Sequence, residues 1–164
     1  MKPEFAKYLQ QDSILVLEGD SKEVRNAKGA KSSKINVLEA IIQHAATRCP
    51  LDEELIRDLV WKREHMMTTG VGKGLALPHI RVNGFASPLV VVAVCKKPIP
   101  AEDYKSLDGQ PIRLVVFLAA DESDQEAYLK LLGSISAKLK SDNVIDDIMA
   151  AGNDCAKILD ILSC

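Results

Sequence analysis

A histidine follows a short glycine-rich segment in the middle of the chain. Residues 68–81 read TTGVGKGLALPHIR, so three alternate glycines precede an apolar step, a proline and His79. Clustered glycines allow the backbone to turn sharply and to approach a ligand closely. The apolar step 75–77 fits a very short strand that ends at Pro78, because proline has no N–H for the ladder. The pattern predicts a histidine held at a strand end beside a loop of free backbone N–H groups.

A neutral imidazole in this place would present a nucleophilic nitrogen. The ordinary histidine pKa of about 6.5 leaves the side chain largely neutral near pH 7. The backbone N–H groups of Gly70, Gly72 and Gly74, with the guanidinium of Arg81, would stabilise phosphoryl oxygens as charge moves onto them. A histidine at a strand end can also be a structural hydrogen-bonding group, and the residues alone leave both interpretations of His79 open.

The helix predicted before the glycines carries an arginine in line with its apolar residues. Ile56, Val60 and Arg63 recur three or four positions apart, so Arg63 continues the inward stripe. A guanidinium cannot lose its proton, and one that faces inward needs an acidic partner or a bound anion. The alternative is that its stem packs while its charged head reaches solvent. His65 is expected to be an exposed helix-end residue, and His44 has no predicted role.

The glycines do not match the two common nucleotide-binding motifs. A dinucleotide fingerprint needs G-x-G-x-x-G between a strand and a helix, whereas here a helix precedes the glycines and a strand follows them. A P-loop needs Gly-Lys followed by Ser or Thr, but Gly74 follows Lys73. Nucleotide binding is therefore not expected, and Lys73 is predicted to be a solvated loop charge.

Two apolar runs indicate the strands that would support this segment. Residues 89–95 and 112–118 are rich in β-branched residues, as in strands buried on both faces. A turn at Asp108-Gly109 leads into the second run. Because such strands alternate with amphipathic helices, the pattern predicts an α/β sheet covered by helices on both sides.

Helical periodicity appears twice before the glycine segment. Residues 29–33 are predicted to form a loop that ends with serine at a helix N-cap, and the helix then runs to Cys49-Pro50. A second helix is predicted from about Asp52 through Glu64. One face of it is expected to carry the apolar residues Leu55, Ile56, Leu59 and Val60.

The C-terminal third is predicted to be mainly helical. Ser123 followed three residues later by Glu126 is the pattern of a capping box. The helix that it begins is expected to bury a stripe of Leu129, Leu132, Ile135 and Leu139. A short element over 144–149 and a last helix capped by Asp154 follow.

Composition and charge exclude several classes of protein. The 164 residues are 47% hydrophobic and 27% charged, as in one globular domain. A net charge of −2 gives no field that would hold nucleic acid or an anionic membrane. Four dispersed cysteines without a C-x-x-C pair predict free thiols rather than a metal or redox site. Because a signal peptide and a bilayer-spanning run are both lacking, we expect a cytoplasmic protein without membrane insertion.

Taken together, these segments resemble the signature of fructose/mannitol-type enzyme IIA domains of the bacterial phosphoenolpyruvate-dependent phosphotransferase system. The specific part is Arg63-Glu64 followed by residues 68–79, TTGVGKGLALPH. Residues 108–114, DGQPIRL, and 128–132, YLKLL, are similar to later segments of the family. The resemblance covers about residues 5–162 and implies a single domain over 5–162, a three-layer sandwich of a mixed sheet between helices.

The resemblance further implies a phosphocarrier. It makes His79 the acceptor of a phosphoryl group from the phosphohistidine of the carrier protein HPr or a paralogue, and it places Arg63 in the active site. Thr69 and the amides of the glycine segment would support the phosphoryl oxygens. No metal, nucleotide or other cofactor is implied, because the group passes directly between side chains of two proteins. Catalysis then depends on alignment and charge stabilisation.

One position departs from the family pattern. Tyr128 stands where family members commonly carry a second active-site histidine. Its hydroxyl can hydrogen-bond to a phosphate or to His79, but a pKa near 10 leaves it uncharged at pH 7. The alternative is that Tyr128 packs in phase with the apolar stripe of its helix. Phosphorylation of His79 is expected to remain possible, with altered transfer kinetics or a changed downstream acceptor.

Three functions follow from this comparison. A free-standing domain of this length looks more like the nitrogen-regulatory branch of the family, so a regulatory phosphocarrier that acts on target proteins is the leading expectation. The second is a sugar-specific IIA component that passes phosphate to a IIB protein. The third is a binding module that keeps the fold without being phosphorylated.

Overall fold

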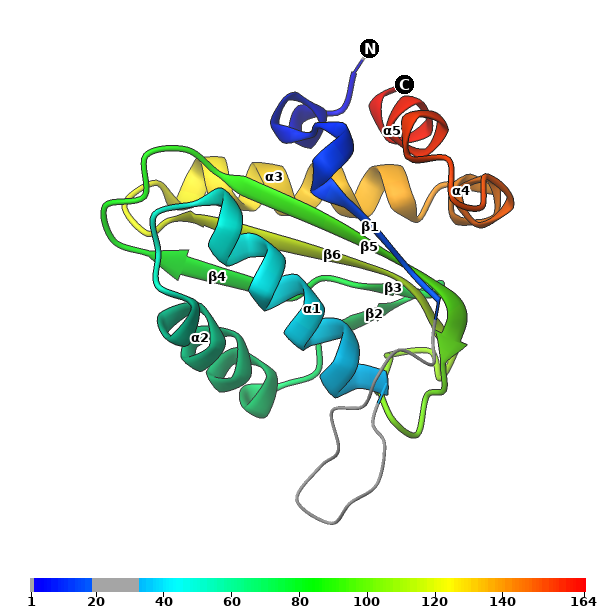
Figure 1. The fold of residues 1–164 in the computed structure, drawn as a ribbon, viewed down its shortest axis with the longest axis horizontal. Helices are drawn as coiled ribbons and strands as arrows, with labels where there is room; N and C mark the ends of the chain where they lie inside the picture. Colours follow the sequence, from blue (N-terminus) through cyan, green and yellow to red (C-terminus); the bar gives the residue numbers. More distant parts are fainter. Residues whose placement is uncertain (1, 19–32) are drawn as a thin grey trace.

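A six-stranded mixed sheet forms the middle layer of the molecule (Figure 1). The computed structural model describes residues 2–18 and 33–164. The sheet runs in the order β1-β5-β6-β3-β2, and β4 also pairs with β6. The strands are β1 (Ile14–Leu17), β2 (Gly70–Gly72), β3 (Leu75–Ala76), β4 (His79–Val82), β5 (Leu89–Ile99) and β6 (Ile112–Asp121).

The two longest strands, β5 and β6, form the centre of the sheet, which confirms the prediction from the two apolar runs. They pair antiparallel, with Val92 opposite Val116. Both faces of each strand are buried over most of its length, as their continuous β-branched character requires. Each strand continues beyond its predicted end, β5 to Ile99 and β6 to Asp121.

The segment that leads to His79 lies in line along one side of β6. Leu75 of β3 pairs with Leu114, and His79 of β4 pairs with Leu118, in both cases parallel. Pro78 lies between the two short strands, where its carbonyl accepts a hydrogen bond from the Leu118 N–H at 3.1 Å. Pro78 thus separates β3 from β4 while the chain keeps its direction along β6, and His79 starts the second strand.

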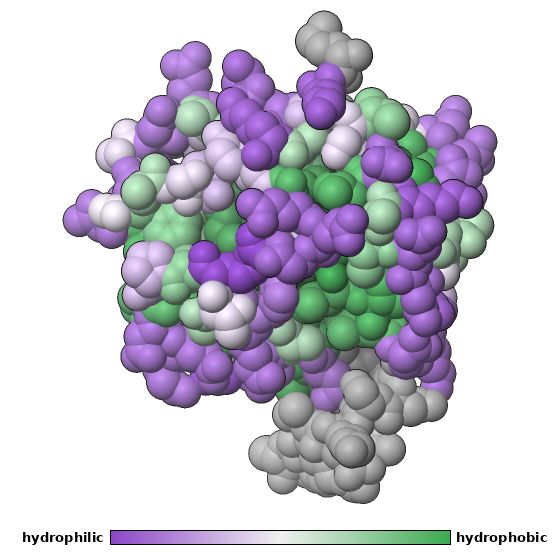
Figure 2. Space-filling view, turned by 45° about the horizontal axis from the view of Figure 1, so that its top comes forward, coloured by the Kyte–Doolittle hydropathy of each residue, from purple (hydrophilic) through white to green (hydrophobic). Residues whose placement is uncertain are grey.

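Helices cover both faces of this sheet (Figure 1). One face carries α1 (Ser33–Arg48) and α2 (Glu53–Met66). The other carries α3 (Gln125–Leu139), α4 (Val144–Ala150), α5 (Cys155–Ser163) and two short 3-10 helices, η1 (Glu4–Tyr8) and η2 (Gln11–Ser13). Each helical layer buries its own apolar core against the sheet, which confirms the three-layer α/β prediction. The surface in Figure 2 shows hydrophobic patches separated by hydrophilic side chains.

The helix caps agree with the sequence prediction in part. The Asp154 carboxylate caps α5 by accepting the Lys157 N–H at 3.1 Å. The prediction for α3 was wrong, because its N-cap is Asp124, which accepts the Ala127 N–H at 3.0 Å. Ser123 instead donates both its N–H and its hydroxyl to Asp121, so it forms no capping box. The predicted loop before α1 lies largely outside the described residues, and Ser33 begins that helix.

The apolar stripe of α3 is rotated from the predicted one. Leu129 is 54% exposed, whereas Tyr128 and Leu131 are buried with Ile135 and Leu139. Leu55 of α2 was also predicted to face inward and is 42% exposed. In both helices, neighbouring apolar residues allow either of two faces to be the buried one. Packing against the sheet decides which face is buried.

Candidate functional site

The predicted site lies at an edge of the sheet, where β4 runs between α2 and α3 (Figure 1). Alternate residues of a strand face opposite sides of the sheet. Ile80 is buried in the core beneath α1 and α2, and Val82 packs against the same core. His79 and Arg81 therefore share the opposite face, toward α3.

His79 is held with one defined nitrogen open. Its Nδ1 lies 2.6 Å from the Leu77 carbonyl oxygen, which is an acceptor only, so Nδ1 carries the proton and donates it. The lone pair is then on Nε2, which receives a long hydrogen bond of 3.4 Å from the Arg63 Nε. Burial lowers the pKa of His79, and the nearby positive charge of Arg63 lowers it further. The hydrogen bond to Leu77 and the charge of Glu64 act in the opposite direction, but the net effect is a lowered pKa. The side chain is thus kept neutral and nucleophilic.

Arg63 reaches this histidine from the last turn of α2. Its Nη1 donates to the Met67 carbonyl at 2.8 Å, where the helix ends, and this bond orients the guanidinium. The Arg63 side chain is half-buried. It is therefore neither fully inward nor a packed stem with its head in solvent, the two alternatives from the sequence. No carboxylate of the described residues forms an ion pair with it. The guanidinium therefore keeps donors for an anion placed beside His79.

Tyr128 closes the site from the first turn of α3. Its ring centroid lies 5.9 Å from that of His79, with the planes tilted by 54°. Arg81 lies over the same ring, with its Cζ 5.1 Å from the centroid. Burial raises the pKa of Tyr128, so the hydroxyl is neutral near pH 7. Tyr128 thus packs as one interpretation proposed, and it also lines the site.

A shallow cavity of about 420 Å³ opens above these groups. Its lining includes Lys62, Arg63, Met66, His79, Arg81 and Tyr128. Three of these six side chains are cationic and none is acidic, so the cavity suits an oxyanion. The structure therefore brings His79, Arg63 and Tyr128 together. Arg81, whose guanidinium the sequence pattern predicted to lie near His79, lines the same cavity.

The structure turns Thr69 away from His79. The Thr69 side chain is 2% exposed, and its hydroxyl donates to the Glu64 carboxylate and lies 2.5 Å from the Tyr104 hydroxyl. The reason is strand alternation and pairing, because the Thr69 carbonyl accepts the Leu77 N–H and the side chain then faces inward. The expected support of phosphoryl oxygens by Thr69 does not fit this orientation.

Glu64 is the centre of a buried polar cluster that the sequence analysis missed. It is 6% exposed and forms an ion pair of 3.0 Å with the Lys34 ammonium. The Tyr104 hydroxyl donates to it at 3.2 Å, and Lys34 also lies 4.6 Å from the Tyr104 ring centroid. The signal was present, since Glu64 follows Ile56 and Val60 at helical spacing on the buried face of α2. The cluster ties α2, α1 and the segment before β2 together and so fixes Arg63.

The glycines form a hairpin that leads away from His79. Gly72, Lys73 and Gly74 all have positive φ, at 103°, 54° and 82°, and make the turn between β2 and β3. Four residues of β6 separate the partners of Leu75 and His79, about 13 Å at ~3.3 Å per residue. The free amides expected from Gly72 and Gly74 are therefore not beside the imidazole.

The backbone N–H groups of Gly70 and Lys73 already have hydrogen-bond acceptors. The Gly70 N–H donates to the Thr68 hydroxyl at 3.3 Å, and the Lys73 N–H donates to the Asp108 carboxylate at 2.8 Å. A methyl group on Gly70 would lie 2.3 Å from the Lys105 carbonyl oxygen, so this glycine is needed for close packing of two backbones. The glycines therefore shape the β2–β3 hairpin that precedes β4 and do not contact the His79 imidazole.

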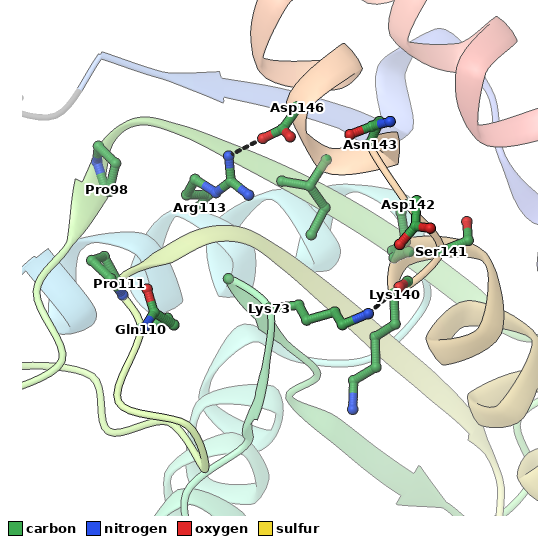
Figure 3. A pocket seen from close by; sticks show the side chains of 13 residues that line it. Lys73, Pro98, Gln110, Pro111, Arg113, Lys140, Ser141, Asp142, Asn143 and Asp146 are labelled. Atoms are coloured by element: carbon green, nitrogen blue, oxygen red, sulfur yellow. Dashed lines mark hydrogen bonds and ion pairs between the residues drawn. The ribbon is translucent and has the colours of Figure 1, made fainter.

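A second cavity, of about 460 Å³, lies at the hairpin turn (Figure 3). Lys73 is exposed, as predicted, and its ammonium donates there to the Lys140 carbonyl at 3.0 Å. Arg113 and Asp146 form an ion pair of 2.5 Å across the same cavity. This cavity is at the opposite end of β3 and α3 from Tyr128 and His79. It is separate from the site described above.

Two other features bear on the class of site. Among residues 2–18 and 33–164, no group of three or more His, Cys, Asp or Glu side chains could hold a metal ion. Over the same described part of the chain, no helix has the length and apolar character needed to cross a membrane. His65 is exposed, as predicted, its ring centroid lies 6.1 Å from that of Trp61, and it does not line the His79 cavity.

In this α/β sandwich a histidine and two guanidinium groups line one cavity at the sheet edge, an arrangement that suits the binding of an oxyanion. Residues 21–163 match the family described as phosphoenolpyruvate-dependent sugar phosphotransferase system, EIIA 2. This match includes the whole site and most of the chain. The chain belongs to this family, whose members are the IIA phosphocarrier components of the phosphotransferase system.

Known proteins agree with this assignment. A nitrogen regulatory protein of Pseudomonas aeruginosa is 36% identical over 120 residues, 73% of this chain and 76% of that protein. The crystal structure of the nitrogen regulatory protein IIA-Ntr from Neisseria meningitidis has the same fold, with a TM-score of 0.77 and 19% identity over 96% of this chain and 98% of that one. The Escherichia coli mannitol IIA, solved in complex with phosphorylated IIB, has a TM-score of 0.68 and 16% identity over 94% of this chain and 96% of that one.

Proposed function

We propose that His79 is the phosphoryl acceptor of this IIA domain and that its donor is the phosphohistidine of an HPr-like carrier protein. The observation that carries the proposal is the hydrogen bond from Nδ1 to the Leu77 carbonyl. It fixes the proton on one nitrogen and leaves Nε2 with a lone pair, facing a cavity with no acidic lining residue among those described. We infer that Nε2 is the nitrogen that is phosphorylated.

The transfer is a direct displacement between two imidazoles. The Nε2 lone pair forms the N–P bond while the bond from phosphorus to the donor's nitrogen breaks and its electron pair returns to that nitrogen. The proton on Nδ1 stays in place, and the Leu77 carbonyl stabilises the cationic ring that results. Arg63 exchanges its long bond to Nε2 for bonds to phosphoryl oxygens, which are shorter and charge-assisted. The residues present thus supply alignment and charge stabilisation.

A macromolecular donor fits the surface beside the site. Met66 and Met67 at the end of α2 are 76% and 66% exposed, and Leu129 on α3 is 54% exposed. Met66 lines the cationic cavity, Met67 follows it in the chain, and Leu129 follows Tyr128, which also lines the cavity. Flexible methionines suit contact with more than one partner. Changing Met67 to a charged residue should slow phosphorylation by the carrier protein.

The same site serves a regulatory or a transport role, and we favour regulation. The basis is the nitrogen regulatory protein that is 36% identical to this chain. The alternative, transfer to a sugar-specific IIB protein, is supported by the mannitol IIA complex with phosphorylated IIB, a structure with the same fold. We place the domain over residues 5–162, because η1 packs on α3 and α5. We also place the protein in the cytoplasm, with its four thiols free.

The test is labelling with radioactive phosphoenolpyruvate, enzyme I and a cognate HPr-like protein. Acid-labile, base-stable label that is lost in His79→Ala and kept in His65→Ala supports the proposal. Absence of label on the wild type with a working donor would refute the proposal and support a binding module that is not phosphorylated. Rapid loss of label to added IIB proteins would favour transport over regulation.

A further inference from the structure

Two arginines of the described residues have no carboxylate partner, and both line the cavity at His79. The described chain contains five arginines, at positions 48, 57, 63, 81 and 113. Three of them are paired with acids: Arg48 with Asp12, Arg57 with Glu39, Glu53 and Glu54, and Arg113 with Asp146. Arg63 and Arg81 are the remaining two. An unpaired guanidinium in a partly buried place indicates a missing anion.

Arg81 is oriented by neutral groups. Its Nη2 donates to the Glu122 carbonyl oxygen at 2.7 Å, and its Cζ lies over the Tyr128 ring, 5.1 Å from the centroid. These contacts fix the guanidinium without neutralising it. Its Nε is buried and has no hydrogen-bond partner within the described chain. Leaving such a donor unsatisfied is unfavourable, so a bound acceptor would remove the cost.

The position of Arg81 relative to His79 follows from the strand. The two residues are two apart on β4, so their side chains lie on the same face of the sheet. Both line the cavity that Tyr128 and Arg63 also border. The Tyr128 ring contacts His79 and Arg81 and holds them side by side.

We propose that Arg81 is a second phosphoryl-binding residue, which together with Arg63 clamps the oxygens of the group on His79 from the opposite side. This inference rests on the proposed function. Arg63 approaches from α2 and Arg81 from β4, so the two guanidinium groups contact different oxygens. Tyr128 acts as a positioning residue, because its neutral ring keeps Arg81 beside the imidazole and adds no charge of its own.

The test compares Arg81→Gln with Arg113→Gln. Both variants lose one guanidinium, but Arg113 lies at the other end of the sheet, beside the hairpin cavity. At equilibrium with a phosphorylated donor, Arg81→Gln should carry on the order of tenfold less phosphoryl group, as expected for one charge-assisted hydrogen bond. Arg113→Gln should equal the wild type. Arg81→Lys, which keeps the charge without the fork, should recover part of the loss.

A second measurement separates this inference from the proposed function. Inorganic phosphate is titrated into the unphosphorylated protein while the His79 ring signals are followed by NMR. Phosphate should bind Arg81→Gln on the order of tenfold more weakly than Arg113→Gln. If the wild type takes no label, the proposed function fails, and this titration alone decides the assignment of Arg81. Equal phosphate binding by the two variants overturns it, and so does equal labelling of them when the wild type does take label.

Discussion

Gly70→Ala should destabilise the protein because two backbones meet at this position. The methyl group would lie 2.3 Å from the Lys105 carbonyl oxygen and 2.9 Å from the Ser106 Cα. Neither atom belongs to a flexible side chain, so the segment around Lys105 must move. The movement also weakens the hydrogen bond from the Leu107 N–H to the Gly70 carbonyl, which is already 3.2 Å long.

The size of the effect follows from two contributions. Overpacking of a closely packed site costs about 1–3 kcal/mol. Each weakened hydrogen bond adds up to ~1 kcal/mol, and the bond from Thr68 to the Lys105 carbonyl is affected as well. We expect a loss of about 2–4 kcal/mol, equivalent to a decrease of roughly 4–16 °C in Tm for a domain of this size.

The matched control is Gly133→Ala. Gly133 lies on the exposed side of α3, and an added methyl group would have no atom within 4 Å. Since alanine favours a helix over glycine by about 0.5–1 kcal/mol, this variant should be slightly more stable than the wild type. Urea unfolding followed by circular dichroism measures both. A Gly70→Ala protein as stable as the wild type would refute the packing argument.

Three other predictions concern the caps and the site. Asp124→Ala should lower the free energy of unfolding by about 1 kcal/mol through loss of the α3 cap, and a larger loss for Ser123→Ala in the same urea experiment would contradict the assignment. Burial lowers the pKa of His79 below its ordinary value of 6.5. Just below pH 6.5, His79 is therefore protonated in the unfolded chain and still neutral in the folded protein. The free energy of unfolding should fall as the pH decreases through this range. His79→Gln should flatten this dependence, and an unchanged slope would rule out His79 as its source. Arg63→Gln should raise the pKa of His79, read from an NMR titration of the imidazole, whereas Lys73→Gln at the distant hairpin should not.

The sequence predicted the framework well, for physical reasons. Continuous β-branched runs are typical of strands covered on both faces, and β5 and β6 are such strands. Arg63 and His79 were singled out because helical spacing and an isolated histidine after a strand-ending proline are local patterns, and the structure places the two side chains in contact. Both patterns depend on neighbours within a few residues, and these are visible in one sequence.

Other features depended on contacts that the sequence does not specify. Glycines close to His79 in sequence are carried away from it because β2 and β3 form a hairpin. Thr69 faces inward because its backbone pairs with Leu77, and its hydroxyl there meets Glu64 of another element. The phase of α3 was chosen by its packing on the sheet, which exposed Leu129 in place of Tyr128. In each case a distant segment decides between local alternatives of similar energy.

The adjacent residues Arg63 and Glu64 restrict how this protein can evolve. Successive residues of a helix point about 100° apart, so Arg63 contacts His79 at the edge of the sheet while Glu64 enters the interior with Lys34. Inserting or deleting one residue between Ile56 and Arg63 would rotate the end of α2 by that angle. It would move the guanidinium off the imidazole and the carboxylate out of its buried cluster in a single event. We expect descendants of this chain to vary freely on the solvent side of α2 and to keep its length unchanged.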